Sequence, residues 1–482
     1  MEHFDLIVIG SGPAGEKGAA QAAYFDKRVA LIERSPHVGG AGINTGTVPS
    51  KTLREAALYF SGLRQRGLYG IDYSLKENMS VADFMHREHI VVEEERKIIE
   101  HNLQRHKITL IHGEASLKDA NIVHVSSADG VKEISSDIIL IATGSSPYHP
   151  PEIPFDGDLI YDSDSILHMN RIPKTMAVVG GGVIGTEYAS IFTALGVEVT
   201  LIEPKERILP FVDSEIIERL EYRLTLLGLH FALGDKMTAI ERHKNHVQLT
   251  LEKGGLMEFD IALMASGRQS NVQGLGLEQI GVKLGNRGLV IVNEKFQTSV
   301  PNIYAAGDVI GFPALASTSM EQARVAMVHA FDLEYKEQMS SVLPLAVYAI
   351  PEISWVGITE DECMAKQIPY LVGRAYYENN PRGQIIGDMS GMIKLVFSPT
   401  DKKLLGTHII GEQASELIHI AAHVMIANGT IPLAKLETSN EASGTIDAFI
   451  HSVYNYPTLG DLYKYAAYDG LGNWERLLES TQ

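Results

Sequence analysis

The sequence predicts an α/β protein with three domains, and two observations predict this fold class. A strand, a glycine-rich turn, a helix and a second strand follow one another twice, which is typical of Rossmann-like dinucleotide-binding domains. After about residue 341, β-rich segments alternate with apolar helices, which indicates an α+β domain. The length of 482 residues agrees with about three domains.

The first copy of the repeated unit starts at the N-terminus. Residues 5–9 form a short apolar run with the pattern of a buried parallel strand. A helix of small residues is expected from Pro13 to about Tyr24, and a second strand from Arg28 to Glu33. This order of elements predicts one dinucleotide-binding domain.

The turn of the first copy reads G-x-G-x-x-G. Gly10 allows a tight turn, Gly12 lets the backbone approach a pyrophosphate, and Gly15 lets helix and strand pack closely. The helix N-terminus offers free N–H groups and a partial positive charge to the phosphates. Glu33 follows Gly10 by 23 positions and is placed to accept hydrogen bonds from ribose hydroxyls.

The second copy has the same order and the same spacing between its first glycine and its acid. Its strand, turn, helix and second strand are expected at Met176–Val179, Gly180–Gly185 (with glycines at 180, 182 and 185), Thr186–Leu195 and Glu198–Glu203. Glu203 follows Gly180 by 23 positions. The match predicts two separate dinucleotide domains, with Gly180, Gly182, Gly185 and Glu203 at the second nucleotide.

Glu203 also predicts which nicotinamide nucleotide the second domain prefers. A carboxylate at this position accepts from the ribose 2′-hydroxyl of NAD and repels the 2′-phosphate of NADP. Arg207 lies four residues on and weakens this argument. We therefore expect NAD(H) to be preferred, with NADP(H) as the second candidate.

The remaining segments complete the three domains. A polar helix is expected from Val81 to about Arg105. Strands are expected in the segments 138–144, 262–268 and 302–308, and the last of these returns to the first domain. Strands at 393–397 and 404–410 and a helix at 412–428 belong to the third domain. The expected domains are 1–150 (FAD-binding, first part), 151–272 (NAD(P)-binding), 273–340 (FAD-binding, return segment) and 341–482 (dimerisation).

Composition excludes several classes of partner. There are 41 basic against 60 acidic residues, which disfavours nucleic acid and anionic membranes. No run of about 20 apolar residues and no secretory signal is present, so a cytoplasmic location is expected. The one cysteine, Cys363, excludes an intrachain disulfide and a cysteine-type zinc site; it lies among acidic residues that would raise a thiol pKa. No metal-ligand spacing is found, and we expect no metal.

Several further motifs give the chain a specific resemblance. They are Gly39-Gly40, Pro49-Ser50-Lys51, Ala142-Thr143-Gly144, Gly185-Thr186-Glu187, Gly267-Arg268 and Ala306-Gly307-Asp308. With the two glycine turns, they resemble the pyridine nucleotide–disulfide oxidoreductases, the family of lipoamide dehydrogenase and glutathione reductase, over nearly the whole chain. The resemblance implies bound FAD, with Asp308 at its ribityl chain. It also implies further cofactor contacts from Arg34, Gly40, Thr47, Lys51, Thr143, Gly144, Gly267, Arg268, Gly307 and Ala316.

The chain departs from the family at its redox centre. The two cysteines that the family places four residues apart fall on Gly42 and Thr47, which cannot carry electrons. The histidine of the family's C-terminal acid–base pair falls on Tyr456, a poor base at neutral pH. Thiols and base are missing together, and one cysteine cannot form a dithiol relay, so reduction of lipoamide or glutathione is excluded.

Within the family the chain most resembles the soluble pyridine nucleotide transhydrogenases. The similarity lies in residues 145–150, 161–167, 187–192 and 455–458, and in the threonine at the second cysteine position. That group usually keeps the first cysteine, and this chain does not. Glu203 is also unlike a site built to accept NADP(H).

Three residues are the candidates for catalysis: Lys51, Glu187 and Tyr456. The resemblance implies that Lys51 lies beside flavin N5 and pairs with Glu187, where a fixed cation favours the reduced flavin; the alternative is an ordinary structural ion pair. Tyr456 donates a hydrogen bond in the pocket or packs in the core, and both alternatives stay open. His149, His408 and His419 are expected to be structural.

Three functions remain after these exclusions. The first is hydride transfer from NAD(P)H to FAD and on to a second nicotinamide nucleotide, without a redox disulfide. The second is an NADH-dependent reductase acting on a quinone, a dye or oxygen; the third is a non-catalytic flavoprotein that senses or scaffolds. The family resemblance further implies a homodimer formed through the third domain, and the sequence does not name the physiological electron acceptor.

Overall fold

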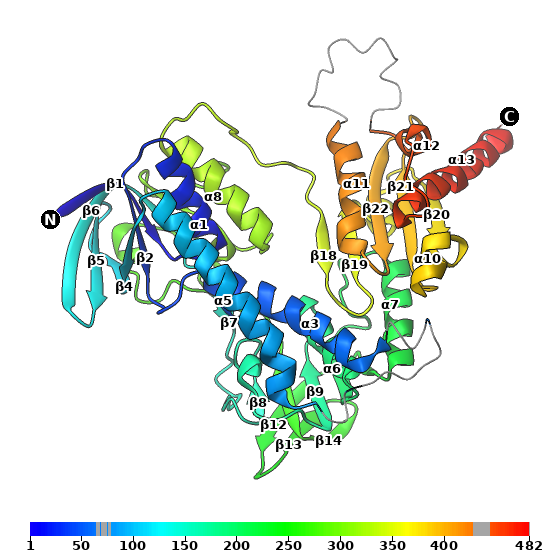
Figure 1. Ribbon diagram of the computed structural model, residues 1–482, viewed down its shortest axis with the longest axis horizontal. Coiled ribbons are helices and arrows are strands. Elements are labelled where there is room, and N and C mark those ends of the chain that lie inside the picture. The colour runs from blue at the N-terminus through cyan, green and yellow to red at the C-terminus, as the bar shows by residue number, and fades with distance from the viewer. Residues whose placement is uncertain (64–67, 69–74, 76–78, 428–443, 482) are drawn as a thin grey trace.

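The computed structural model describes residues 1–63, 68, 75, 79–427 and 444–481, and its sheets form three units (Figure 1). The first unit carries α1, α5 and α8, the second carries α6 and β9, and the third carries α11 and α13. The fold class is as predicted: two units contain parallel strand pairing in a sheet with helices, and the sheet of the third is antiparallel. The predicted domain boundaries stay a prediction.

The first sheet has the order β3-β2-β1-β6-β5-β4, and β17 pairs with β6. The C-terminal half of β6 pairs in parallel with β1 and β17, and its N-terminal half pairs antiparallel with β5. The segment at 302–308 therefore returns to the first sheet, as predicted. The strands are β1 (Glu2–Ile9), β2 (Val29–Glu33), β3 (Thr109–His112), β4 (Glu114–Leu117), β5 (Ile122–Ser127), β6 (Gly130–Ile141) and β17 (Ile303–Ala305).

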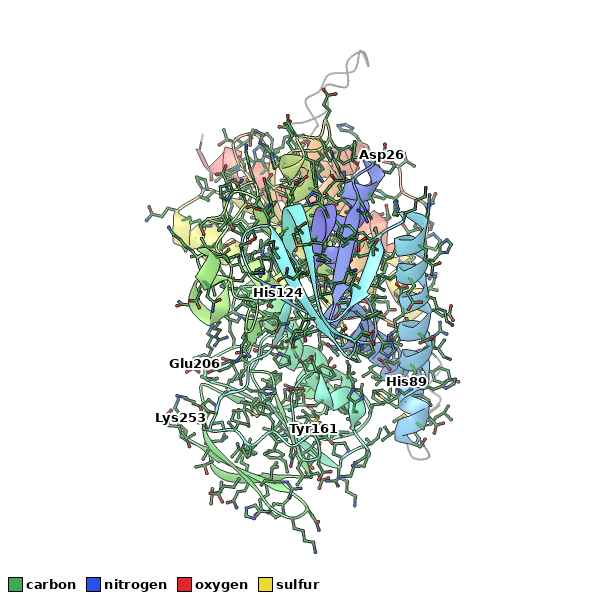
Figure 2. All side chains as sticks on the ribbon, turned by 90° about the vertical axis from the view of Figure 1, so that its left-hand side faces the viewer. Asp26, His89, His124, Tyr161, Glu206 and Lys253 are labelled. Atoms are coloured by element: carbon green, nitrogen blue, oxygen red, sulfur yellow. The ribbon has the colours of Figure 1, made fainter. Side chains whose placement is uncertain are left out.

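Helix α1 packs on this sheet and α8 packs on α1 and β17, while α1 and α5 begin at recognisable caps. Helix α1 starts at Pro13 directly after Gly12, so its first N–H groups stay free at the turn. Helix α5 starts at a capping box in which Ser80 and Asp83 exchange hydrogen bonds; Figure 2 shows α5 along one side of the molecule, with His89 pointing outward. The helices are α1 (Pro13–Tyr24), α2 (Gly40–Asn44), α3 (Thr47–Ser61), α5 (Val81–Arg105) and α8 (Ala316–Ala330).

The second unit has a parallel sheet of order β11-β10-β9-β15-β8 and an antiparallel sheet β12-β13-β14. A short pair, β7 (Ser145–Pro147) with β16 (Arg268–Ser270), lies beside it. The other elements are β8 (Ile160–Tyr161), β9 (Thr175–Val179), α6 (Val183–Ala194), β10 (Glu198–Glu203), α7 (Ser214–Leu227), β11 (His230–Leu233), β12 (Met237–Arg242), β13 (Val247–Leu251), β14 (Gly255–Phe259) and β15 (Ile261–Met264).

The third unit has an antiparallel sheet of order β18-β19-β22-β21-β20. Helix α11 packs on β22 and β19, and α13 packs on β20 and β21. The elements are β18 (Leu345–Val347), β19 (Ile353–Gly357), α9 (Glu360–Lys366), β20 (Leu371–Tyr376), α10 (Pro381–Ile386), β21 (Met392–Phe397), β22 (Leu404–Ile410), α11 (Ala414–Ala427), α12 (Asp447–His451) and α13 (Leu462–Thr481).

Several predicted elements have other bounds in the structure; for example, the first strand begins at Glu2 and not at residue 5. Helix α6 begins at Val183 and not at Thr186, because Gly182 already serves as its N-cap. The strand expected at 262–268 ends at Met264, and Arg268 opens the separate strand β16. The helix expected at 412–428 begins at Ala414, and residue 428 lies outside the described residues.

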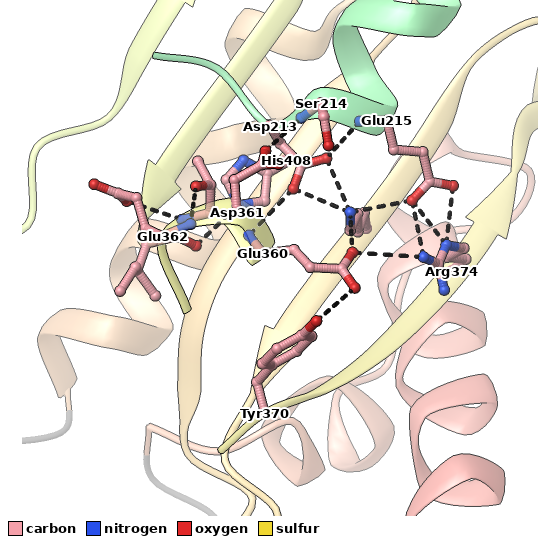
Figure 3. Close-up of polar contacts among 12 residues, drawn as sticks. Asp213, Ser214, Glu215, Glu360, Asp361, Glu362, Tyr370, Arg374 and His408 are labelled. Atoms are coloured by element: carbon pink, nitrogen blue, oxygen red, sulfur yellow. Dashed lines mark hydrogen bonds and ion pairs between the residues drawn. The ribbon is translucent and has the colours of Figure 1, made fainter. Parts of the chain in front are cut away.

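A buried cluster of charges joins the second unit to the third (Figure 3). Lys394 on β21 is 1% exposed and contacts carboxylates of Asp213, Glu215 and Glu360. Arg374 on β20 pairs with Glu215 at 2.9 Å. Burial alone would lower the pKa of Lys394, but the surrounding carboxylates outweigh it and raise that pKa. The cluster therefore fixes the start of α7 against the third sheet.

Candidate functional site

A cavity of about 920 Å³ lies where the three units meet. The first glycine turn, α3, the start of α8, the start of α6 and the segment around β18 all contribute to its wall. Its size is in the range of cavities that hold cofactors. The predicted site residues that line it are Gly10, Gly12, Glu33, Arg34, Gly40, Thr47, Lys51, Thr143, Gly144, Glu187, Arg268, Gly307, Asp308 and Ala316.

The first glycine turn has the close packing that its sequence predicts. A Cβ on Gly15 would lie 1.8 Å from the carbonyl oxygen of Gly10, so helix α1 could not approach β1 with any other residue there. Gly10 has a φ of +102°, and a Cβ on it would lie 2.4 Å from the Ala142 carbonyl oxygen. Gly12, in contrast, has only the Gly40 Cα near its open side, at 3.8 Å. The turn therefore leaves its backbone open toward the cavity at Gly12.

Glu33 is held at the end of β2 by the turn itself. The Ser11 backbone N–H and hydroxyl both donate to Glu33 Oε2, at 2.9 and 2.6 Å, and Ser35 N–H donates to Oε1 at 2.7 Å. The carboxylate is 7% exposed yet lines the cavity. Its position is fixed, and its remaining acceptor capacity is available to ribose hydroxyls.

The residues present fit a flavin dinucleotide. Thr143 Oγ1 is buried and has no hydrogen-bond partner, which marks a polar atom that a ligand would satisfy. The cavity also presents the open turn at Gly12 and the first turn of α8 beginning at Ala316. An N-terminal helix turn and a glycine turn are the groups that bind a pyrophosphate. FAD held there would contact both.

Asp308 belongs to a short polar chain that crosses the cavity wall. Ser145 Oγ donates to Asp308 Oδ2 at 2.8 Å, and Arg268 Nε donates to Ser145 Oγ at 2.8 Å. Arg268 Nη1 also lies 3.9 Å from Oδ1 of Asp164, which lines the cavity and whose pKa is raised by burial. The sequence prediction did not name Ser145 and Asp164 as site residues, although both lie in segments (145–150 and 161–167) that resemble the transhydrogenases, because their place at the cavity depends on tertiary contacts.

Lys51 and Glu187 form the predicted ion pair at the cavity wall. Lys51 Nζ lies 2.9 and 2.7 Å from the two carboxylate oxygens of Glu187, which is 4% exposed. The backbone N–H of Tyr348 donates to Glu187 Oε1 at 2.9 Å. Residues from α3, α6 and the segment after β18 thus meet at one point, and Lys51 presents a fixed cation to the cavity.

The segment that carries cysteines elsewhere in the resembled family has a tight backbone here. A Cβ on Gly42 would lie 2.8 Å from Pro13 Cγ, so a side chain at 42 requires a local shift at the Pro13 ring. Thr47 opens helix α3 and lines the cavity. Cys363 is fully buried in α9 and is not among the residues that line the cavity; burial, aided by Glu362 and Glu360, raises its thiol pKa.

The second glycine turn repeats the geometry of the first outside this cavity. A Cβ on Gly185 would lie 1.8 Å from the Gly180 carbonyl oxygen, whereas a Cβ on Gly182 would meet nothing within 4 Å. Gly181 N–H donates to Glu203 Oε2 at 2.6 Å, which parallels the Ser11–Glu33 contact. Helix α6 runs from this turn to the cavity, where Val183, Ile184 and Glu187 line the wall. Helix α6 therefore begins at the second glycine turn and places Glu187 at the cavity that the first glycine turn also lines.

Four other residues singled out from the sequence lie outside the cavity or at its border. Tyr456 is 73% exposed, so the alternative of a packed core tyrosine is wrong, and it does not line the cavity of its own chain. Gly267 has a φ of +105° just before Arg268 and does not line the cavity. His408 is fully buried and shares a hydrogen bond with the Ile358 carbonyl, while His419 is exposed and borders the cavity.

His149 pairs with an acidic residue and an aromatic ring: its Nε2 lies 2.6 Å from Asp162 Oδ2, and its ring stacks on Phe155.

Among the described residues, no group of three histidine, cysteine, aspartate or glutamate side chains has a metal-binding arrangement. In the same part of the chain, no helix has the length and apolar character needed to cross a bilayer.

Comparisons with known proteins agree with this geometry. Residues 4–330 match the pyridine nucleotide-disulphide oxidoreductase family, and residues 343–441 match the dimerisation domain of that family. The soluble pyridine nucleotide transhydrogenase of Mycobacterium bovis BCG is 41% identical over 479 residues, covering 99% of both chains. The protein of the same name from Yersinia pestis is 39% identical over 470 residues, covering 97% of this chain and 98% of the relative.

Solved structures show the same architecture. LpdA of Mycobacterium tuberculosis has a TM-score of 0.85 at 26% identity, over 97% of this chain and 99% of that chain. A Cu(II) complex of RclA, an HOCl-induced flavoprotein disulfide reductase of Escherichia coli, has a TM-score of 0.83 at 27% identity, over 96% of this chain and 99% of that chain. The family implies an oxidoreductase that uses FAD and a nicotinamide nucleotide. The chain belongs to the pyridine nucleotide-disulphide oxidoreductases.

Proposed function

We propose that this protein passes a hydride from NADH to FAD and from FAD to a second nicotinamide nucleotide, with no thiol relay between them. The observation that carries the proposal is the intact Lys51–Glu187 pair at a cavity that has Gly42 and Thr47 where a cysteine pair would stand. Since Cys363 is buried in α9, electrons have no thiol through which to leave the flavin. Relatives named soluble pyridine nucleotide transhydrogenase support this choice of acceptor.

The residues of the cavity have separate tasks in this proposal. Gly12 and the first turn of α1 would hold the pyrophosphate of FAD, Glu33 the adenosine ribose, and Asp308 the ribityl chain. FAD supplies the chemistry, because its ring accepts a hydride from one nicotinamide and gives it to another. Lys51 would supply a positive charge near the ring, which stabilises the reduced state. Glu187 keeps that charge in place.

The second turn supports a preference for NAD(H). Glu203 is anchored by Gly181 N–H at 2.6 Å and Lys205 N–H at 3.0 Å, so the carboxylate cannot easily move away from an entering 2′-phosphate. Arg207 donates to the Pro210 carbonyl and does not neutralise Glu203 in this arrangement. NADP(H) is the second candidate nucleotide, and its binding would have to overcome repulsion at Glu203.

A homodimer is part of the proposal. The third unit matches a dimerisation domain, and it exposes large side chains at Val453 (95%), Tyr456 (73%), Tyr465 (53%) and Tyr468 (50%). Aromatic side chains are enriched at interfaces. In a dimer Tyr456 would act at the partner's cavity and not at its own. Sedimentation velocity at micromolar concentration tests this, since a monomer would contradict it.

Two half-reactions measured under anaerobic stopped-flow conditions test the proposed function. Mixing with NADH is expected to bleach the flavin absorbance, and mixing the reduced protein with NADP⁺ or thio-NAD⁺ is expected to restore it. Lys51→Met removes the cation at the cavity and should slow bleaching by NADH. Lys97→Met is its control, because Lys97 is 57% exposed on α5 and is not among the residues that line the cavity. If NADH bleaches the flavin and neither nucleotide restores it, the transhydrogenase proposal fails.

A second candidate is an NADH-dependent reductase of a quinone, a dye or oxygen. It is favoured by Glu203 and by the apolar part of the cavity wall from the third unit, which includes Leu343, Pro344 and Ile418. Reoxidation of the reduced protein by a quinone at a rate far above that with any nucleotide would select this candidate. A flavin that NADH cannot bleach would instead favour a sensor or scaffold.

A further inference from the structure

Tyr348 contacts both members of the ion pair at the cavity. It follows β18, the first strand of the third unit, and lines the cavity with Lys51 and Glu187. Its backbone N–H donates to Glu187 Oε1 at 2.9 Å, and its ring centroid lies 4.9 Å from Lys51 Nζ. One residue of the third unit therefore touches the cation on α3 and the carboxylate on α6.

The ring contact adds to the fixation of Lys51. Nζ already donates to both oxygens of Glu187, at 2.9 and 2.7 Å, and to Ser50 Oγ at 3.3 Å. A cation over the face of an aromatic ring is attracted by the ring quadrupole, and the attraction grows when the cation is partly removed from water. Lys51 is in that state, with a side chain 28% exposed. The Tyr348 ring therefore restrains an ammonium group that water would otherwise solvate.

The phenol of Tyr348 is tethered in turn. It has a side-chain interaction with Ser415 on α11, and Ser415 Oγ donates to Glu352 Oε2 at 2.7 Å. Burial raises the pKa of Tyr348, which keeps the phenol protonated and able to donate at neutral pH.

The tether returns to the helix that carries Lys51. Glu352 Oε1 lies 3.3 Å from Arg54 Nη2, and Arg54 is 3% exposed on α3, three residues after Lys51. Arg54 Nε also donates to the Ala349 carbonyl, next to Tyr348, at 2.9 Å. The contacts thus close a loop from α3 through the third unit and back to α3.

We propose that Tyr348 is a positioning residue that fixes the Lys51 charge against the flavin and couples its position to the third unit. The proposal rests on the function proposed above, in which the Lys51 cation stabilises reduced FAD. A cation that moves away from the developing negative charge stabilises it less. Loss of the Tyr348 side chain should therefore make bound FAD harder to reduce, even though Lys51 and Glu187 are both still present.

The test is a reductive titration of FAD-loaded protein with dithionite and a reference dye, without nicotinamide. Tyr348→Leu keeps the backbone donor and removes ring and phenol; we expect the reduced-to-oxidised ratio at fixed potential to fall about tenfold, which is about 30 mV for two electrons. Tyr348→Phe keeps the ring and loses only the tether, so we expect a smaller fall, about two- to threefold. Ser415→Ala cuts the same tether and should match Tyr348→Phe.

A matched control is Tyr376→Leu, which removes a ring 5.0 Å from the Arg219 guanidinium, outside the cavity. We expect it to leave the flavin potential unchanged. Unchanged potential in FAD-loaded Tyr348→Leu, or an equal shift in Tyr376→Leu, would overturn the proposal.

If Tyr348→Leu does not fold with FAD, the two milder variants, Tyr348→Phe and Ser415→Ala, provide the test. Equal shifts in Tyr348→Phe and Ser415→Ala that do not add in the double variant support the tether, whereas wild-type potentials in both overturn it. Because the titration uses no nicotinamide, it separates the two proposals. Variants that still exchange hydride without any shift refute only the role of Tyr348, and a wild-type flavin that no second nucleotide reoxidises refutes only the transhydrogenase function.

Discussion

Lys394→Met tests whether the buried charge cluster holds the second unit against the third. Methionine has a similar length and no charge, so the variant removes one cation and leaves three carboxylates. Glu215 keeps its two-pronged contact with Arg374, but Asp213, which is fully buried, loses its 2.9 Å partner. It retains backbone N–H donors only at 3.2 and 3.3 Å, from residues 215 and 360.

The magnitude follows from burial. Removing one partner of a buried ion pair costs about 3–5 kcal/mol, because the remaining charge is left without compensation. At about 2–4 °C per kcal/mol for a unit of 150–250 residues, the unfolding midpoint should fall by about 6–20 °C. Exposed Lys97 pairs with Glu94 at 3.0 Å, and Lys97→Met should cost less than about 1 kcal/mol.

The pH dependence gives a second check on the same variant. Burial alone would raise the pKa of Asp213, but the charges of His408 and Lys394 outweigh it and hold the pKa below its ordinary value of 3.8. A lowered carboxyl pKa contributes stability above the unfolded value, and this contribution is lost as pH falls through the folded pKa. The difference in the free energy of unfolding between wild type and Lys394→Met should therefore become smaller below about pH 4.

Thermal unfolding followed by circular dichroism, with FAD in excess, measures these effects. The double variant Asp213→Asn/Lys394→Met should regain part of the loss, because it no longer buries an unpaired charge. An unfolding midpoint for Lys394→Met within about 2 °C of wild type, the shift expected for less than about 1 kcal/mol, would refute the reasoning.

The other predictions concern the second nucleotide and the cysteine. Glu203→Gln should raise the KM for NADH and reduce the discrimination against NADPH by about tenfold, equal to about 1.4 kcal/mol, in steady-state assays; unchanged ratios of kcat/KM would contradict the role of Glu203. Gly182→Ala meets open space, so it should keep the fold and FAD while weakening NADH binding, whereas Gly185→Ala, with its 1.8 Å clash, should disrupt folding of the second unit. Cys363 should not react with a thiol reagent in the native protein at pH 8 and should titrate as one thiol in denaturant, since burial raises its pKa; rapid native labelling would contradict this.

Local patterns in the sequence predicted the parts of the fold that depend on local chemistry. Helices at Pro13–Tyr24 and Val81–Arg105 and the strand at Glu198–Glu203 have the predicted bounds, because caps, glycine turns and apolar runs define their ends. The start of α6 was misplaced because Gly182 serves both as a turn residue and as an N-cap. Gly12 has the same double role, but Pro13 marks the first position of α1, whereas Val183 carries no such signal.

The candidate site was predicted where motifs mark it and missed where only tertiary contacts define it. Lys51 and Glu187 lie in motifs and were found, although they are 136 positions apart. Tyr348 has no local signal, because its importance comes from meeting both residues across three elements. Lys394 had a signal that was not used: it is the single charge in a strand, Met392–Phe397, whose six residues are all buried. A lone lysine in such a run predicts a buried carboxylate partner.

Anaerobic titration of the purified, FAD-loaded protein with NADH, followed by its absorbance, tests the central claim most directly. The account predicts that one equivalent of NADH per FAD bleaches the flavin completely, because no thiol pair is available to take a second pair of electrons. One equivalent of an oxidised nicotinamide nucleotide should then restore the spectrum. A requirement for two equivalents of NADH per FAD would reveal a second redox group and contradict direct transfer between nucleotides.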